Sequence, residues 1–169
     1  MHNPNRILEK WEEEDVINVM FVCHGNICRS PMAEIVLRRM LEDEGLTDRI
    51  SVCSAATSDE ELGNPIYPPA REELLRRGYT LDGKKRAVQL RRDDYDHYDL
   101  FVCMDHNNLR NMRRIFGSDL QEKMHLLMDF TERGGEVADP WFTGRFDVTF
   151  GDVTEGCEAL LRALKQKLF

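Results

Sequence analysis

Several features that define whole classes of protein are missing from this sequence. It has no apolar run approaching the roughly 20 residues that a helix needs to cross a bilayer. Basic residues are outnumbered, with 23 Lys and Arg against 31 Asp and Glu and a formal net charge of −8, which argues against nucleic-acid binding. No internal repeat or low-complexity stretch marks a linker. We therefore expect a globular chain with neither a membrane nor a nucleic-acid partner.

Cysteine and histidine are few and scattered. The five cysteines are an odd number, include no Cys-x2-Cys pair and lack the spacing of a secreted disulfide framework. The five histidines do not have the spacing of metal ligands. These patterns predict no metal, no cofactor and a reducing compartment. Residues 1–15 are polar and acid-rich, unlike the usual targeting sequences, so we expect the protein in the cytoplasm.

What is present is the length of one domain, 169 residues, of which 41% are hydrophobic. Short apolar segments predict buried strands at 16–22, 50–54, 99–105 and 124–128. Amphipathic segments predict helices at 32–41, 68–77, 106–116 and 147–169. Strands that alternate with helices indicate an α/β fold, here a single-domain four-stranded parallel sheet flanked by helices on both faces.

The segment from Cys23 to Pro31 forms a short loop between the first predicted strand and the first predicted helix. Strand, tight loop and helix together direct backbone N–H groups and a helix N-terminus at one point, which makes an anion site. The same N–H groups would stabilise a thiolate at Cys23. Arg29 offers paired donors that match two oxygens of a phosphate or sulfate. This combination indicates attack by sulfur on a bound phosphoryl group.

Other residues of this loop have backbone roles in the same prediction. Gly25 allows close approach of the backbone, and Asn26 tolerates the left-handed conformation that such a loop requires. Ser30 is expected to cap the helix, with Pro31 at its first position. The Ser30 hydroxyl is also able to donate to the Cys23 sulfur.

The run Cys-x-Gly-Asn-Ile-Cys-Arg-Ser-Pro resembles the phosphate-binding loop of the low-molecular-weight protein tyrosine phosphatases. The resemblance implies the fold of that family over residues 16–169, after a short extension of residues 1–15. We favour an extension that packs on the domain as a helix or arm over one that docks a partner. The resemblance also implies that the phosphate is held by the backbone of His24, Gly25, Asn26, Ile27, Cys28 and Arg29.

The resemblance continues beyond the loop. It implies that Ser54, at the end of the second strand, holds the side chain of Asn26. It also implies that Asp139, which precedes a proline, is the general acid. Trp141 and Phe142 stand where the family often has tyrosines, so they are expected to form one wall of the substrate cleft without the hydroxyl contacts.

The implied reaction is the hydrolysis of phosphotyrosine in a protein substrate. The Cys23 thiolate attacks phosphorus to form a cysteinyl-phosphate, while Arg29 and the loop amides hold the phosphoryl oxygens. Asp139 protonates the leaving oxygen and then takes a proton from water, so a bell-shaped pH profile is expected. Inorganic phosphate and vanadate are the expected inhibitors, and no metal is required.

Two positions have competing interpretations. Cys28 either fills the start of the first helix or forms a disulfide with Cys23 that protects the nucleophile from over-oxidation, and the resemblance implies the disulfide. The basic cluster 84–86 is expected to be a solvated loop, and the less favoured interpretation is that it helps to attract an anionic substrate. The family often has a histidine at the position of Lys85, which implies a different hydrogen-bond network behind the phosphate loop.

Three other functions remain open at this point. An arsenate reductase on the same fold needs two further cysteines on a mobile segment, whereas Cys53, Cys103 and Cys157 are predicted to pack in the core. A protein-arginine phosphatase of this family has threonine where this chain has Ile27, and an apolar side chain suits an aryl ester better than a guanidinium. A non-catalytic phosphate-binding or redox-sensing module is the third alternative.

Overall fold

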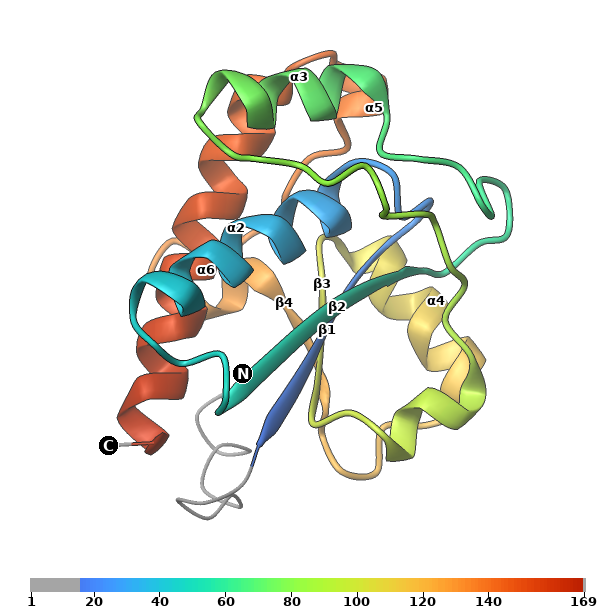
Figure 1. Ribbon diagram of the computed structural model, residues 1–169. Coiled ribbons are helices and arrows are strands. Elements are labelled where there is room, and N and C mark those ends of the chain that lie inside the picture. Colours follow the sequence, from blue (N-terminus) through green and yellow to red (C-terminus); the bar gives the residue numbers. More distant parts are fainter. Residues whose placement is uncertain (1–15, 169) are drawn as a thin grey trace.

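The computed structural model describes residues 16–168 and contains one four-stranded sheet (Figure 1). Its strands are β1 (Ile17–Cys23), β2 (Ile50–Ala56), β3 (Leu100–Cys103) and β4 (Met124–Leu126). They lie in the order β2-β1-β3-β4, and all three neighbouring pairs are parallel. The chain leaves β1 toward β2 on one side and later returns to β3 on the other. The carboxyl ends of β1 and β3 therefore meet where parallel sheets usually bind their ligands.

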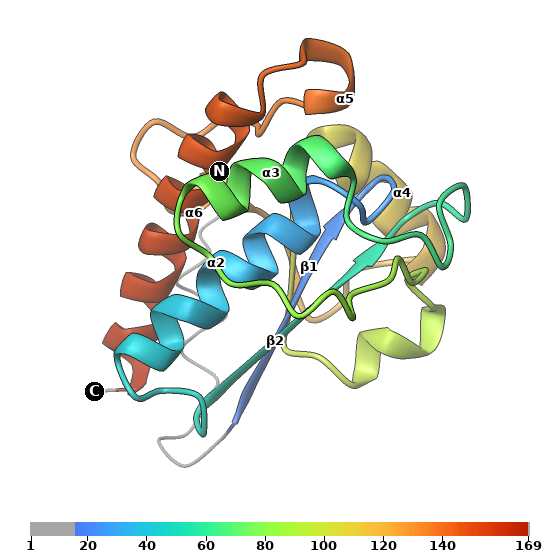
Figure 2. The same ribbon diagram turned by 45° about the horizontal axis from the view of Figure 1, so that its top comes forward.

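Helices cover both faces of this sheet, which confirms the predicted fold class. In Figures 1 and 2, α2, α3 and α6 lie on one side of the sheet and α4 lies on the other. The bounds of the helices are α2 (Arg29–Asp43), α3 (Pro68–Arg76), α4 (His106–Phe116), α5 (Pro140–Thr143) and α6 (Phe146–Leu168). Two 3-10 turns complete the described chain, η1 (Arg92–Asp96) and η2 (Leu127–Phe130).

The central strand β1 divides the core between the two faces. Val19 and Phe21 pack in one cluster together with residues of α2 and α6. Met20 and Val22 pack in a second cluster that includes Met112 of α4. This alternation follows from the strand geometry, in which successive side chains point to opposite faces. Both sets are buried, which explains why the segment reads as a continuous apolar run.

The last helix, α6, closes the larger of these clusters. The predicted apolar stripe is buried at Val153, Cys157, Leu160, Leu161 and Leu164. Gly156 lies on the same side, and a Cβ atom added there would overlap the side chain of Leu127 in η2. The absence of a side chain at this position lets α6 approach η2 closely.

Several predicted boundaries differ from the structure. β4 ends at Leu126, and the apolar residues that follow it form the buried turn η2, because burial alone does not distinguish a strand from a turn. β2 extends to Ala56, where it still pairs with Cys23 of β1. β3 ends at Cys103, and Asp105 caps α4 as predicted by accepting a hydrogen bond from the backbone N–H of Asn108 at 2.7 Å.

The predicted N-terminal element lies outside the described residues, so the division between residues 15 and 16 stays a prediction. Within residues 16–168, no helix is both long and apolar enough to cross a membrane.

Candidate active site

The loop after β1 wraps around the sulfur of Cys23. The side chain is buried, and its Sγ lies 3.3 Å from the backbone nitrogen of Asn26, which donates to it. Asn26 has a positive φ of 59°, the left-handed conformation that the sequence predicted. Gly25 has a more specific reason to be glycine, because a Cβ atom there would lie 3.3 Å from Cγ of Glu61. The loop therefore packs closely against the segment that follows β2.

The predicted helix cap at Ser30 is wrong. α2 already begins at Arg29, so Ser30 is its second residue and Pro31 its third, and no side chain of the described chain caps the helix. The reason is that the Ser30 hydroxyl points back to the loop. Its Oγ lies 3.0 Å from the sulfur of Cys23 and accepts a hydrogen bond from Asn26 at 2.8 Å. The other expectation for Ser30, a contact of its hydroxyl with the Cys23 sulfur, is confirmed.

A chain of hydrogen bonds continues from Asn26 into the protein. Its Nδ2 also donates to the Ser54 hydroxyl at 2.9 Å, the contact that the resemblance implied. Ser54 in turn donates to the carboxylate of Glu34 at 2.6 Å. When Cys23 is a thiolate it has no proton to donate, so the Ser30 hydroxyl is then the donor in its contact with the sulfur. Because the Glu34 carboxylate is an acceptor, the Ser54 hydroxyl donates to it and accepts the hydrogen bond from Asn26.

Glu34 and Lys85 were not predicted as parts of this site. Lys85 is half-buried instead of solvated: its Nζ donates to the carbonyl of Ser54 at 3.1 Å and lies 4.0 Å from Glu34. Burial lowers the pKa of Lys85, and the charge of Glu34 opposes that shift. Glu34 is also paired with Arg38 at 2.9 Å. The sequence did contain a signal for Glu34. It lies three residues before Leu37 and therefore shares the buried face of the helix, where a carboxylate needs partners.

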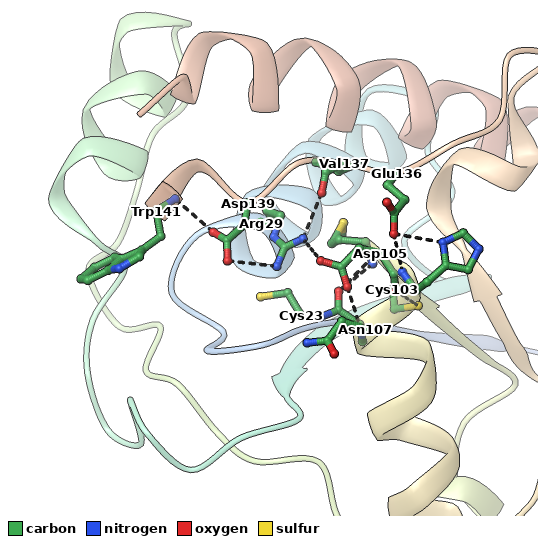
Figure 3. A network of polar contacts seen from close by, with 12 residues as sticks. Cys23, Arg29, Cys103, Asp105, Asn107, Glu136, Val137, Asp139 and Trp141 are labelled. Atoms are coloured by element: carbon green, nitrogen blue, oxygen red, sulfur yellow. Dashed lines mark hydrogen bonds and ion pairs between the residues drawn. The ribbon is translucent and has the colours of Figure 1, made fainter. Parts of the chain in front are cut away.

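Arg29 connects three segments of the chain, as Figure 3 shows. Its Nη1 donates to Asp105 at 2.6 Å and to the carbonyl of Val137 at 2.9 Å, while Nη2 lies 3.4 Å from Asp139. Burial disfavours the charged guanidinium, but the negative charges of Cys23, Asp105 and Asp139 outweigh it and raise the pKa of Arg29 above its usual value. The guanidinium is therefore held rigidly beside the sulfur and stays charged.

Asp139 faces the same cavity as Cys23. It precedes α5, and its Oδ1 accepts the backbone N–H of Trp141 at 3.0 Å. The cavity has a volume of about 190 Å³. It is lined by Cys23, His24, Gly25, Ile27, Cys28, Arg29, Glu60, Glu61, Asp139, Trp141 and Phe142. The structure thus brings the predicted nucleophile, clamp and acid together, with the predicted aromatic pair at the same opening.

The aromatic pair is open to solvent. Trp141 is 56% exposed and Phe142 is 84% exposed. The ring of Trp141 packs on Tyr67, with their centroids 5.0 Å apart, and Tyr67 was not predicted as part of the site. An exposed aromatic wall beside a phosphate-sized cavity suits a flat aryl group.

Cys28 lines the cavity together with Cys23, and both are free thiols in this structure. Burial raises the pKa of Cys28 far above its usual range, and the charges of Cys23 and Asp139 add to the shift. Cys28 is therefore a protonated thiol in the same cavity as Cys23. Within residues 16–168, no group of three or more His, Cys, Asp or Glu side chains is arranged to hold a metal ion.

Comparison with known proteins identifies the family of this chain. The family described as "Low molecular weight phosphotyrosine protein phosphatase" matches residues 18–168. The chain belongs to this family. Among its relatives in the low molecular weight phosphatase family are YfkJ of Bacillus subtilis, 35% identical over 90% of this chain and 98% of the relative, and a Gallus gallus phosphotyrosine protein phosphatase, 35% identical over 90% and 96%.

Solved structures of low molecular weight phosphatases agree with the fold. The crystal structure of YfkJ from Bacillus subtilis superposes with a TM-score of 0.87 at 34% identity, covering 92% of this chain and 98% of that one. SP-PTP from Streptococcus pyogenes, a low molecular weight protein tyrosine phosphatase, gives 0.78 at 36% identity over 88% and 93%. The predicted family, fold class and enzyme class are confirmed at the level of the family.

Proposed function

We propose that this member of the low molecular weight phosphatase family hydrolyses phosphotyrosine in proteins, with Cys23 as nucleophile, Arg29 as phosphate clamp and Asp139 as general acid and base. The observation that carries the proposal is the meeting of these three side chains at one cavity of about 190 Å³. Among the described residues, Arg29 is the only buried arginine.

The proposed reaction has two steps. In the first, the Cys23 sulfur forms a bond to phosphorus, the bond from phosphorus to the tyrosyl oxygen breaks, and Asp139 gives its proton to that oxygen. In the second, water attacks the cysteinyl-phosphate, Asp139 takes a proton from the water, and the sulfur leaves with inorganic phosphate as the product. Arg29 and the loop amides stabilise the charge on the transferred group in both steps.

The lining of the cavity supports an aryl ester over the alternatives. Ile27 contributes an apolar side chain to the lining of the cavity, which it shares with the aromatic pair. A phosphorylated arginine would bring a guanidinium to the same apolar surface. An arsenate reductase would need cysteines that can move to Cys23, whereas Cys103 and Cys157 are fully buried in the core.

We further propose that Cys28 protects the nucleophile by forming a reversible disulfide with Cys23: a peroxide oxidises the Cys23 thiolate to a sulfenic acid, and the Cys28 thiol condenses with it with loss of water. The shared cavity supports this role, and packing at the start of α2 is the alternative. A reducing compartment would restore both thiols after oxidation. We propose that the protein works in the cytoplasm. Inorganic phosphate and vanadate, which fit the same anion site, are the proposed inhibitors.

A single series of assays tests the function. The purified protein is given p-nitrophenyl phosphate, a phosphotyrosine peptide and a phosphoarginine peptide, with and without EDTA and orthovanadate. We expect turnover of the two aryl esters that survives EDTA, is blocked by vanadate and disappears in Cys23→Ser. Cys53→Ser, which removes a thiol outside the cavity, is the matched control and retains activity. Turnover of the phosphoarginine peptide alone would overturn the proposed substrate, and no turnover under reducing conditions would indicate a binding module.

A further inference from the structure

Two carboxylates stand at the opening of the candidate active site without a part in the proposed reaction. Glu60 and Glu61 line the cavity together with Asp139. Among the cavity-lining residues of the described chain, only Arg29 and His24 are basic, and Arg29 is already engaged by Asp105 and Asp139. Carboxylates beside a dianion site repel the ligand that the site is built to bind. Any favourable interaction of Glu60 and Glu61 must therefore be with a part of the substrate other than the phosphate.

The segment that carries these carboxylates is fixed to the phosphate loop. The backbone nitrogens of Thr57 and Ser58 donate to the carbonyls of Cys23 and His24 at 2.9 and 3.0 Å. The Ser58 hydroxyl adds a hydrogen bond of 2.9 Å to the same His24 carbonyl. The carboxylates that follow, at 60 and 61, are thus held in place by the loop that binds the phosphate.

The two carboxylates differ in their partners. Glu60 lies 3.0 Å from the His24 ring, and its side chain is 66% exposed. The stem of Glu61 lies over Gly25, and its Oε2 accepts a hydrogen bond from the Asn64 amide at 2.6 Å, which leaves its charge uncompensated. After burial and the charges of Cys23 and Asp139, the charge of Glu61 also contributes to the raised pKa of Cys28, so its field reaches into the cavity.

We propose that Glu60 and Glu61 determine substrate specificity, selecting phosphotyrosine that is flanked by lysine or arginine and disfavouring acidic flanks. The inference rests on the proposed phosphotyrosine phosphatase activity and adds the substrate class to it. A cationic side chain next to the phosphotyrosine pairs with these carboxylates, whereas an acidic one adds to their repulsion of the phosphate. Trp141 and Phe142, at the same opening, offer aromatic faces to the same cation.

The test compares three phosphotyrosine peptides that differ only in having Lys, Gln or Glu on both sides of the phosphotyrosine. For the wild type, we expect kcat/KM for the Lys peptide to exceed that for the Glu peptide by about three- to tenfold, as two exposed ion pairs of ordinary strength would give. The ratio shrinks at about 0.5 M salt, where exposed charges are screened. In the double variant Glu60→Gln/Glu61→Gln, the ratio falls toward one, mainly through faster turnover of the Glu peptide.

Inorganic phosphate gives a second readout that needs no peptide. Because the carboxylates repel the anion, the double variant is inhibited by phosphate at lower concentration than the wild type. Asp59→Asn is the matched control, since Asp59 belongs to the same segment and carries the same charge but does not line the cavity. It leaves both the peptide ratio and phosphate inhibition unchanged.

The outcomes separate this inference from the proposed function. Equal kcat/KM values for the three peptides in the wild type, or an unchanged ratio in the double variant, would overturn the specificity role while the phosphatase stands. An equal effect of Asp59→Asn would also overturn it, because the overall charge and not these two residues would then be responsible. A wild type that hydrolyses none of the peptides and no p-nitrophenyl phosphate would contradict the function itself.

Discussion

The hydroxyl of Ser30 lies 3.0 Å from the sulfur of Cys23, and the Asn26 amide donates to the same hydroxyl. Because a thiolate has no proton to donate, the hydroxyl proton points at the sulfur whenever Cys23 is ionised. Its hydrogen bond stabilises the thiolate as nucleophile in the first step and as leaving group in the second.

Ser30→Ala removes this donor and one acceptor of the Asn26 amide, which keeps its hydrogen bond to Ser54. A hydrogen bond to a charged group contributes about 1.5–3 kcal/mol, so we expect kcat for p-nitrophenyl phosphate to fall by about ten- to a hundredfold. Ser51→Ala, at the exposed start of β2, is the control and keeps the wild-type kcat. Equal values of kcat for Ser30→Ala and the wild type would show that the hydroxyl does not act on the sulfur.

Asp139→Asn removes the proposed proton donor and keeps the shape of the side chain. We expect kcat for a phosphotyrosine peptide to fall by about 10²–10⁴, the usual contribution of general acid catalysis. The loss is smaller for p-nitrophenyl phosphate, because nitrophenolate leaves readily without a proton. The basic limb of the bell-shaped pH profile, where activity falls as the proton donor is deprotonated, is lost in the variant as well. Identical losses for both substrates would argue for a structural role of Asp139.

The two glycines of α6 offer a matched pair for stability. Gly156→Ala forces a methyl group against Leu127, and we expect a loss of about 1–3 kcal/mol in the free energy of unfolding. Gly151→Ala has open space around the new methyl group. Because alanine has a better helix propensity than glycine, we expect the free energy of unfolding to rise by about 0.5–1 kcal/mol. Urea denaturation measures both. A stabilised Gly156→Ala would mean that α6 and η2 are less closely packed than described.

Glu136 gives a pH-dependent prediction. The backbone and side chain of His106 donate to its carboxylate at 2.6 and 3.0 Å and lower the pKa of Glu136. Because the pKa is lower in the folded state, this contribution to stability is present above the unfolded-state pKa, about 4.3, and is lost as the pH falls through the folded-state value.

We therefore expect Glu136→Gln to be less stable than the wild type at pH 7 by about 0.2–1 kcal/mol, the range of exposed ion pairs. The difference disappears near pH 3. Urea denaturation at the two pH values measures it, and a difference that grows toward low pH would contradict the assignment.

How far the sequence predicts the site depends on how local each contact is. The loop from Cys23 to Arg29 is a contiguous motif, and its left-handed Asn26 and its position after a strand were predictable. The partners of Arg29 were not, because Asp105 and Val137 lie 76 and 108 residues away in the sequence. Only the order of the strands brings them together.

The two errors at the loop have a common cause. Ser30 was expected to cap a helix and Lys85 to lie in solvent, since those are the usual local roles of a serine before proline and of a basic cluster. Both side chains instead satisfy buried polar groups around Asn26 and Ser54. Such buried hydrogen-bond networks are decided by tertiary structure, which local propensity does not contain.

Arg29 also couples the chemistry to the completion of folding. The guanidinium of Arg29 is held by residues that follow β3 and η2, and the last of them, Asp139, is also the proposed acid. During synthesis, a chain that ends before residue 137 would present its thiol without a fixed clamp or a proton donor. Phosphatase activity therefore reports on the assembled domain, and a nascent or truncated chain would not consume phosphoprotein.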